Sequence, residues 1–137
     1  MDIIDLERKA ILGTGYGLLA DFAFSTTLWT CLLVILFRYP DLSAYNLKQE
    51  VNLDMRNRMV SFIHGLLILL LSAYQVYFAF TECGDATNST EYFILTVSGG
   101  YFCYDFIAMA WFKLLDRDMA IHHMLCVFGI LVVIAQN

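Results

Sequence analysis

Residues Val60–Phe80 read VSFIHGLLILLLSAYQVYFAF, and apart from the tyrosines their only titratable side chain is His64. The hydrocarbon core of a bilayer is about 30 Å thick, and a helix that crosses it needs roughly 20 mostly apolar residues. This stretch has that length and that composition. It therefore predicts a transmembrane helix.

Three other segments have the same character, at Leu18–Phe37, Phe93–Phe112 and Met119–Ala135. Long unbroken apolar runs predict helices, because the strands of a membrane barrel would alternate apolar and polar residues over about ten positions. We therefore expect an all-α integral membrane protein. Its residues 1–17 would form an N-terminal tail, and its residues 18–137 would form one transmembrane domain with helices at 18–37, 60–80, 93–112 and 119–135.

The composition supports a membrane protein. Of the 137 residues, 60% are hydrophobic and only 15% are charged, whereas a soluble domain needs more charge on its surface. There is no basic stripe, so the sequence gives no support to nucleic-acid binding. The four cysteines show no CxxC or Cys/His spacing, and no metal site is expected. Residues 1–10 lack the pattern of a cleaved signal peptide, so we expect the first apolar run to be retained.

The positions of lysine and arginine predict the orientation in the membrane. The connections 38–59 and 113–118 hold six of the 8 basic residues, and the connection 81–92 holds none. Because basic connections stay in the cytosol, the N-terminus and Asn137 are expected on the lumenal or extracellular side. The sequon Asn88-Ser89-Thr90 falls in the connection assigned to that side, which makes Asn88 a glycosylation candidate.

Ionisable side chains inside the apolar segments are the first candidates for function. Inserting one at the bilayer centre costs about 2.5–3.5 kcal/mol on insertion scales, so such residues are rare without a role. From the helical rise of about 1.5 Å per residue, we expect His64, Asp105, His122 and His123 to lie at similar depths near the cytosolic side. Ser61 lies three residues before His64 and would share its helix face.

A polar stripe marks one face of the helix at 93–112. Helical periodicity places Ser98, Tyr101 and Asp105 on the same side of this otherwise apolar segment. The stripe should face the interior of the bundle. Gly99 and Gly100 lie beside it and would let a neighbouring helix approach closely.

These residues allow more than one interpretation. A carboxylate and imidazoles in a low-dielectric pocket can orient a tautomer, move a proton or activate a nucleophile. His122 and His123 point about 100° apart, so one would face the cavity while the other packs. Alternatively, Asp105 and a histidine form a neutralised pair that holds the helices together. A serine hydrolase is disfavoured, since no GxSxG motif occurs.

Four motifs follow one another along the chain: RMVSFIHG at 58–65, SAY at 72–74, GYFCYD at 100–105 and the adjacent pair His122 and His123. Their order and spacing resemble the TLC domain family, which includes ceramide synthases and translocating-chain-associating membrane proteins. The resemblance covers roughly residues 56–130, and within the family it looks nearest to the small TLC domain-containing proteins, whose chemistry is unassigned.

The resemblance implies a role in membrane lipid homeostasis, with a lipid or acyl chain bound in an intramembrane pocket. In ceramide synthases the adjacent histidines are required for acyl transfer from acyl-CoA to a sphingoid base. By resemblance His122 or His123 would serve here, supported by Asp105, with acyl-CoA as a substrate and no cofactor. The candidate lipid-binding residues are Ser61, His64, Ser98, Tyr101 and Tyr104.

Two departures from the family pattern bear on this expectation. After the histidine pair the chain continues MLCVFGILVVIAQN, where the synthases carry a longer polar signature. A complete TLC domain also has more helices, so the chain looks truncated at its C-terminus. The expected partners are membrane lipids and, as an alternative, other copies of the chain or another membrane protein in a homo- or hetero-oligomer. The expected location is the endoplasmic reticulum or the plasma membrane.

Overall fold

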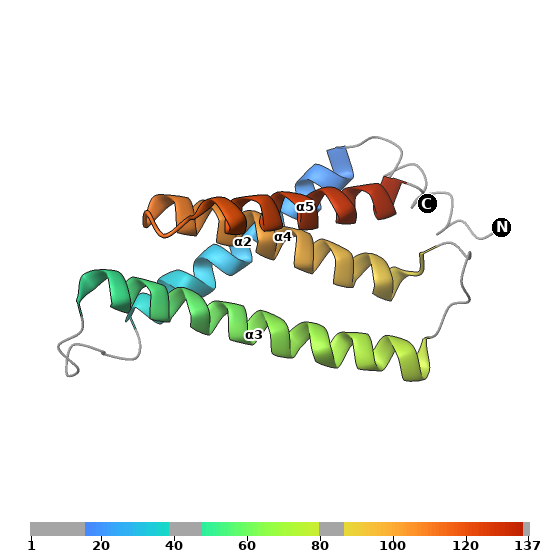
Figure 1. Cartoon of the computed structure of the whole chain (residues 1–137). Helices are drawn as coiled ribbons and strands as arrows, with labels where there is room; N and C mark the ends of the chain where they lie inside the picture. The colour runs from blue at the N-terminus through green and yellow to red at the C-terminus, as the bar shows by residue number, and fades with distance from the viewer. Residues whose placement is uncertain (1–15, 39–47, 80–86, 136–137) are drawn as a thin grey trace.

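The protein is a bundle of long helices (Figure 1). The structure is a computed structural model that describes residues 16–38, 48–79 and 87–135. These residues form four helices and no strand, and each helix is long and apolar enough to cross a membrane. The predicted all-α membrane fold is confirmed. The helices are α2 (Tyr16–Arg38), α3 (Gln49–Phe78), α4 (Ser89–Trp111) and α5 (Arg117–Ala135).

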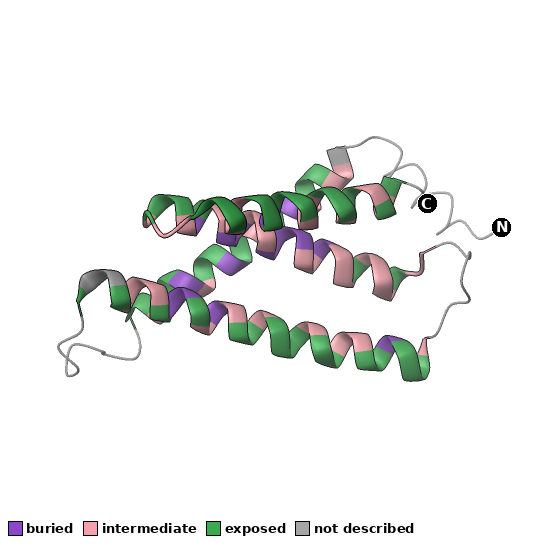
Figure 2. Cartoon of the chain, viewed as in Figure 1, coloured by how far each residue is buried: buried purple, intermediate pink, exposed green. Residues whose placement is uncertain are grey.

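Most of the apolar side chains face outward rather than into a core. Figure 2 shows exposed positions along all four helices. Phe62 is 72% exposed and Trp111 is 83% exposed. Such surfaces suit a hydrocarbon solvent, in which exposed apolar side chains cost nothing. The buried cluster is correspondingly small and consists of Trp29, Leu33, Val60, Tyr101, Tyr104 and Ala108.

Helix α3 begins at Gln49, so the expectation of a loop up to residue 59 is wrong. The extra turns are polar and are stabilised by contacts between side chains four residues apart, such as Arg58 Nε to Asp54 Oδ2 at 2.7 Å. The Arg56 guanidinium also donates to the Leu36 carbonyl oxygen of α2. Hydropathy detects only the apolar part of a helix, which is why this extension was missed. The other helix ends differ from the predicted ones by at most a few residues, and residues 1–15 of the predicted tail lie outside the described residues.

Helix α4 is the centre of the bundle, because it contacts α2, α3 and α5. Among the described helices, α5 contacts α4 alone.

A tight connection joins α4 to α5. Lys113 adopts a left-handed conformation with φ of 59°, and Leu114 N donates to the Met109 carbonyl oxygen at 2.9 Å. Asp116 then caps α5 by accepting from Met119 N at 2.8 Å.

Helices α2 and α4 touch at backbone distance. A Cβ atom placed on Gly100 would lie 2.9 Å from the backbone nitrogen of Thr26, and one placed on Gly99 would overlap the Phe22 ring. The Thr26 hydroxyl donates to the Gly100 carbonyl oxygen at 3.2 Å, and the Trp29 indole nitrogen donates to the Val97 carbonyl oxygen at 3.1 Å. The predicted close approach at the glycine pair is confirmed. Small residues permit this packing, which holds membrane helices together where no hydrophobic force does.

Replacing Gly100 by alanine should therefore separate α2 from α4. We expect Gly100→Ala to lower the free energy of unfolding by about 1–3 kcal/mol, the usual cost of overpacking. Gly99→Ala should cost less, because the Phe22 ring can shift. Gly65→Ala is the control, since a Cβ there meets no atom within 4 Å. Unfolding in mixed detergent micelles measures the three variants, and equal stability of Gly100→Ala and Gly65→Ala would contradict the close contact.

Candidate functional site

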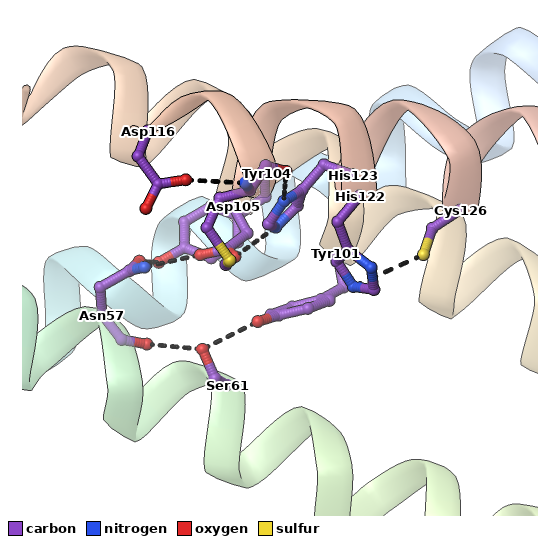
Figure 3. A network of polar contacts seen from close by, with 10 residues as sticks. Asn57, Ser61, Tyr101, Tyr104, Asp105, Asp116, His122, His123 and Cys126 are labelled. Carbon is purple, nitrogen blue, oxygen red and sulfur yellow. Dashed lines mark hydrogen bonds and ion pairs between the residues drawn. The ribbon is translucent and has the colours of Figure 1, made fainter. Parts of the chain in front are cut away.

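A buried carboxyl on α4 joins three helices. Asp105 is 4% exposed. Its Oδ1 accepts a hydrogen bond from Asn57 Nδ2 of α3 at 2.6 Å, and its Oδ2 lies 2.6 Å from His123 Nε2 of α5. The Tyr104 hydroxyl donates to Asn57 Oδ1 at 2.8 Å. These side chains converge between the helices (Figure 3), so one carboxyl organises the packing of α3, α4 and α5.

The contacts of His123 determine how many protons the pair holds. Its Nδ1 lies 2.8 Å from the Met119 carbonyl oxygen, which can only accept, so Nδ1 carries a proton. At 2.6 Å, Nε2 and the Asp105 oxygen need one proton between them, because two lone pairs or two protons would repel. Whichever of the two atoms carries that proton, the pair has no net charge. A neutral pair is what a low-dielectric interior tolerates.

An aromatic cluster lies next to this carboxyl. The His64 ring stacks on the Tyr101 ring with centroids 3.8 Å apart, and Trp29 packs against each of them in a T-shaped arrangement. The Tyr101 hydroxyl donates to Ser61 Oγ at 2.8 Å, and Ser61 Oγ donates to the Asn57 carbonyl oxygen at 3.1 Å. The buried Nε2 of His64 has no hydrogen-bond partner among the residues that the structure describes. The structure thus brings Ser61, His64 and Tyr101 together without a bond from His64 to the carboxyl.

Two of the predicted site residues lie apart from the network. His122 is exposed, and its Nε2 lies 3.7 Å from Cys126 Sγ one turn along the same helix. Ser98 is half-buried, and its hydroxyl makes no hydrogen bond with any residue that the structure describes. The adjacent histidines therefore face different surroundings, with His123 only 2% exposed. Within the described ranges, no group of three His, Cys, Asp or Glu side chains could hold a metal ion.

Sequence reasoning missed two residues of the site. Asn57 was assigned to a loop, and Trp29 was regarded as part of an apolar segment. A signal for Asn57 was present, because Asn57, Ser61 and His64 are spaced four and three residues apart and so fall on one helix face. Nothing in the local sequence marks Trp29, whose indole bonds to a residue 68 positions away.

An apolar pocket with a volume of about 600 Å³ lies between α2 and α4. Trp29 lines it and at the same time packs against His64 and Tyr101. At the far end of α4, Tyr92 donates to Asp21 Oδ2 at 2.8 Å, which links the two helices across the pocket. The apolar walls include Phe24, Leu28, Leu32, Leu67, Phe93 and Val97.

The sequon residue Asn88 caps α4 at the end opposite Asp105. Its side-chain oxygen accepts from Glu91 N at 2.9 Å, and Glu91 Oε2 accepts from Asn88 N at 3.0 Å. The side-chain nitrogen donates to the Ala79 carbonyl oxygen at 3.0 Å. The nitrogen that a glycan would occupy is therefore engaged in a hydrogen bond that ties α3 to α4.

The two histidines should differ sharply in their effect on stability. We expect His123→Ala to lower the free energy of unfolding by about 3–5 kcal/mol, because it leaves the Asp105 carboxyl buried without its partner. His122→Ala removes an exposed ring and should change stability by about 0.5 kcal/mol or less. Unfolding titrations of both variants in the same detergent test this, and equal losses would contradict the assigned pairing.

A comparison with known protein families finds a family model that matches this chain. The family model described as the TLC domain matches residues 54–137. The matched segment includes Asn57, Asp105 and His123, which form the buried network. No solved structure matches the chain. Since the family model covers more than half of the 137 residues and all of this network, the chain belongs to the TLC domain family.

Proposed function

We propose that this multi-pass TLC-domain protein binds the hydrocarbon chain of a membrane lipid between α2 and α4 and acts in membrane lipid homeostasis. The observation that carries this proposal is the apolar pocket of about 600 Å³ on that side of the bundle. Its volume falls within the range of about 300–1,000 Å³ in which small-molecule ligands bind. Both helices are candidate membrane spans, so the occupant would come from the bilayer itself.

The pocket also combines apolar walls with a few polar groups. Asp21, Tyr92 and Thr96 line it beside the apolar side chains. Such sparse polar groups typically orient a ligand whose binding is otherwise hydrophobic. Because Trp29 belongs both to the pocket and to the cluster of His64 and Tyr101, an occupant would contact the wall of the buried network directly.

The lysine and arginine residues at the helix ends support an orientation of the protein in the membrane. Arg38, Lys48, Lys113 and Arg117 lie at the ends of helices on the Asp105 side. At the other ends, where the described helices α3 and α4 meet near Asn88, the described residues include no lysine or arginine. By the positive-inside rule we assign the first side to the cytosol and Asn88 to the lumen or exterior. The membrane would be that of the endoplasmic reticulum or the cell surface.

Filling the pocket should remove the lipid. Leu28 lines the pocket and is 54% exposed, whereas Ile35 on the same helix is 57% exposed and does not line it. We expect Leu28→Trp to reduce the co-purified lipid about tenfold, which corresponds to about 1.4 kcal/mol, and Ile35→Trp to leave it unchanged. Mass spectrometry of lipids extracted from each purified variant measures this. Equal lipid content in both variants would contradict binding at this pocket.

A second candidate function is N-acylation of a sphingoid base by acyl-CoA. The observation that favours it is the 2.6 Å contact between Asp105 Oδ2 and His123 Nε2, at a histidine that also lines a groove of about 260 Å³ between α4 and α5. In such a reaction a histidine accepts the proton of the attacking amine while the CoA thiolate leaves. His122, being exposed, is the other group that a substrate would reach.

Product analysis distinguishes the two candidates. The purified full chain is incubated with acyl-CoA and a sphingoid base, beside a known synthase as a positive control. If the protein is an acyltransferase, N-acyl product must form, and at least one of the variants His122→Ala and His123→Asn must lose it. The lipid-binding candidate expects lipid to co-purify and no product to form. Product that persists in both variants would exclude the histidines from the chemistry.

A further inference from the structure

The far end of α3 holds a buried amide group whose oxygen is unsatisfied. Gln75 is 8% exposed. Its Nε2 donates to the Ala79 carbonyl oxygen at 2.7 Å and to Glu91 Oε1 at 2.9 Å. Its Oε1 is buried and has no hydrogen-bond partner within the described ranges 16–38, 48–79 and 87–135. An unmet buried acceptor of this kind is costly, so it calls for an explanation.

The orientation of this amide is fixed by its neighbours. The two groups that Nε2 meets, a backbone carbonyl and a carboxylate, are both acceptors. Turning the amide over would place Oε1 against both of them, which would replace two hydrogen bonds by two repulsions. The unmet group at this position is therefore an acceptor, and the group that would satisfy it must be a donor.

Gln75 lines a groove of about 320 Å³ that runs between α3 and α4 and reaches α5. Apart from its few polar groups, the groove is walled by Val76, Ile94, Leu95 and Val133. It differs from the α2–α4 pocket in every lining residue. An apolar groove lined by a residue with one unsatisfied acceptor suits an amphiphile whose polar end donates a hydrogen bond.

The neighbouring acid does not require a cation. Glu91 lies in the first turn of α4, where the positive end of the helix dipole stabilises a carboxylate. Each of its oxygens already accepts from an N–H group, one from Gln75 and one from Asn88. The acceptor that remains without a donor is the neutral amide oxygen of Gln75, and a hydroxyl group can donate a hydrogen bond to it. We propose that this groove binds an uncharged lipid alcohol, with its hydroxyl on Gln75 Oε1 and its apolar body along Ile94, Leu95 and Val133.

The depth of the groove agrees with such a ligand. Gln75 lies three residues before the end of α3, Glu91 lies in the first turn of α4, and Val133 lies two residues before the end of α5. The amide is thus close to the ends of all three helices, at the level of the membrane interface, where the hydroxyl of a lipid alcohol also lies. The proposal does not depend on the α2–α4 pocket, and the two fail or succeed separately.

Matched ligand pairs test it with the unaltered protein. The full chain in phosphatidylcholine nanodiscs is titrated with cholesterol, cetyl alcohol and dioleoylglycerol, each beside its O-methyl ether, which cannot donate. We expect at least one alcohol to bind about tenfold more tightly than its ether, the effect of one buried hydrogen bond. The pair that shows the difference identifies the source of the hydroxyl. Equal binding within every pair, or no binding, would overturn the proposal.

Variants then locate the effect. Gln75→Met keeps the length of the side chain without its acceptor, and it should abolish the preference for alcohol over ether. Thr30→Val is the control, because Thr30 is exposed, lines neither the groove nor the α2–α4 pocket, and donates its hydroxyl to the Thr26 carbonyl oxygen of its own helix at 2.8 Å. Loss of the preference in Thr30→Val, or its persistence in Gln75→Met, would contradict the assignment to Gln75. Tighter binding of cetylamine than of cetyl alcohol would overturn the uncharged head group.

Discussion

The bundle depends on the buried contact between Asp105 and His123, whose Oδ2 and Nε2 atoms lie 2.6 Å apart. In a bilayer, helices gain nothing by hiding apolar side chains from one another, so packing and interhelical hydrogen bonds must hold them together. Helix α5 contacts only α4 among the described helices, and its buried polar contact with α4 is this pair. Because Asn57 of α3 bonds to the other carboxyl oxygen, the same residue positions helices on both sides of α4.

Close backbone packing, rather than a contact with Asp105, holds α2 against α4. Helix α2 makes no hydrogen bond to Asp105 and instead rests on Gly99 and Gly100, with Thr26 and Trp29 donating to carbonyl oxygens of α4. The α2–α4 pocket begins beside this contact. Helix α4 therefore places two glycines against α2 and a carboxyl against α3 and α5.

The two ends of the bundle differ in their polar side chains. The Asp105 end lies beside the basic residues, and the opposite end is closed by the hydrogen bonds among Gln75, Asn88 and Glu91. The family match begins at residue 54 and so covers both of these polar groups, whereas α2 lies outside it. The pocket that supports the proposed function consequently combines a matched helix, α4, with one that the match does not include.

The sequence by itself determined the all-α membrane fold and the four helices that are long and apolar enough to span a membrane. These properties are local, since hydropathy and a constant rise per residue are enough to derive them. The tertiary structure alone decided that His123 rather than His122 or His64 meets Asp105, that Asn57 joins them from a helix extended to Gln49, and that Trp29 lines a pocket. Those facts depend on how far each helix is rotated and how closely it approaches its neighbours. Contacts such as that between Asn57 and Asp105, 48 positions apart, set those quantities, and no periodicity within one segment encodes them.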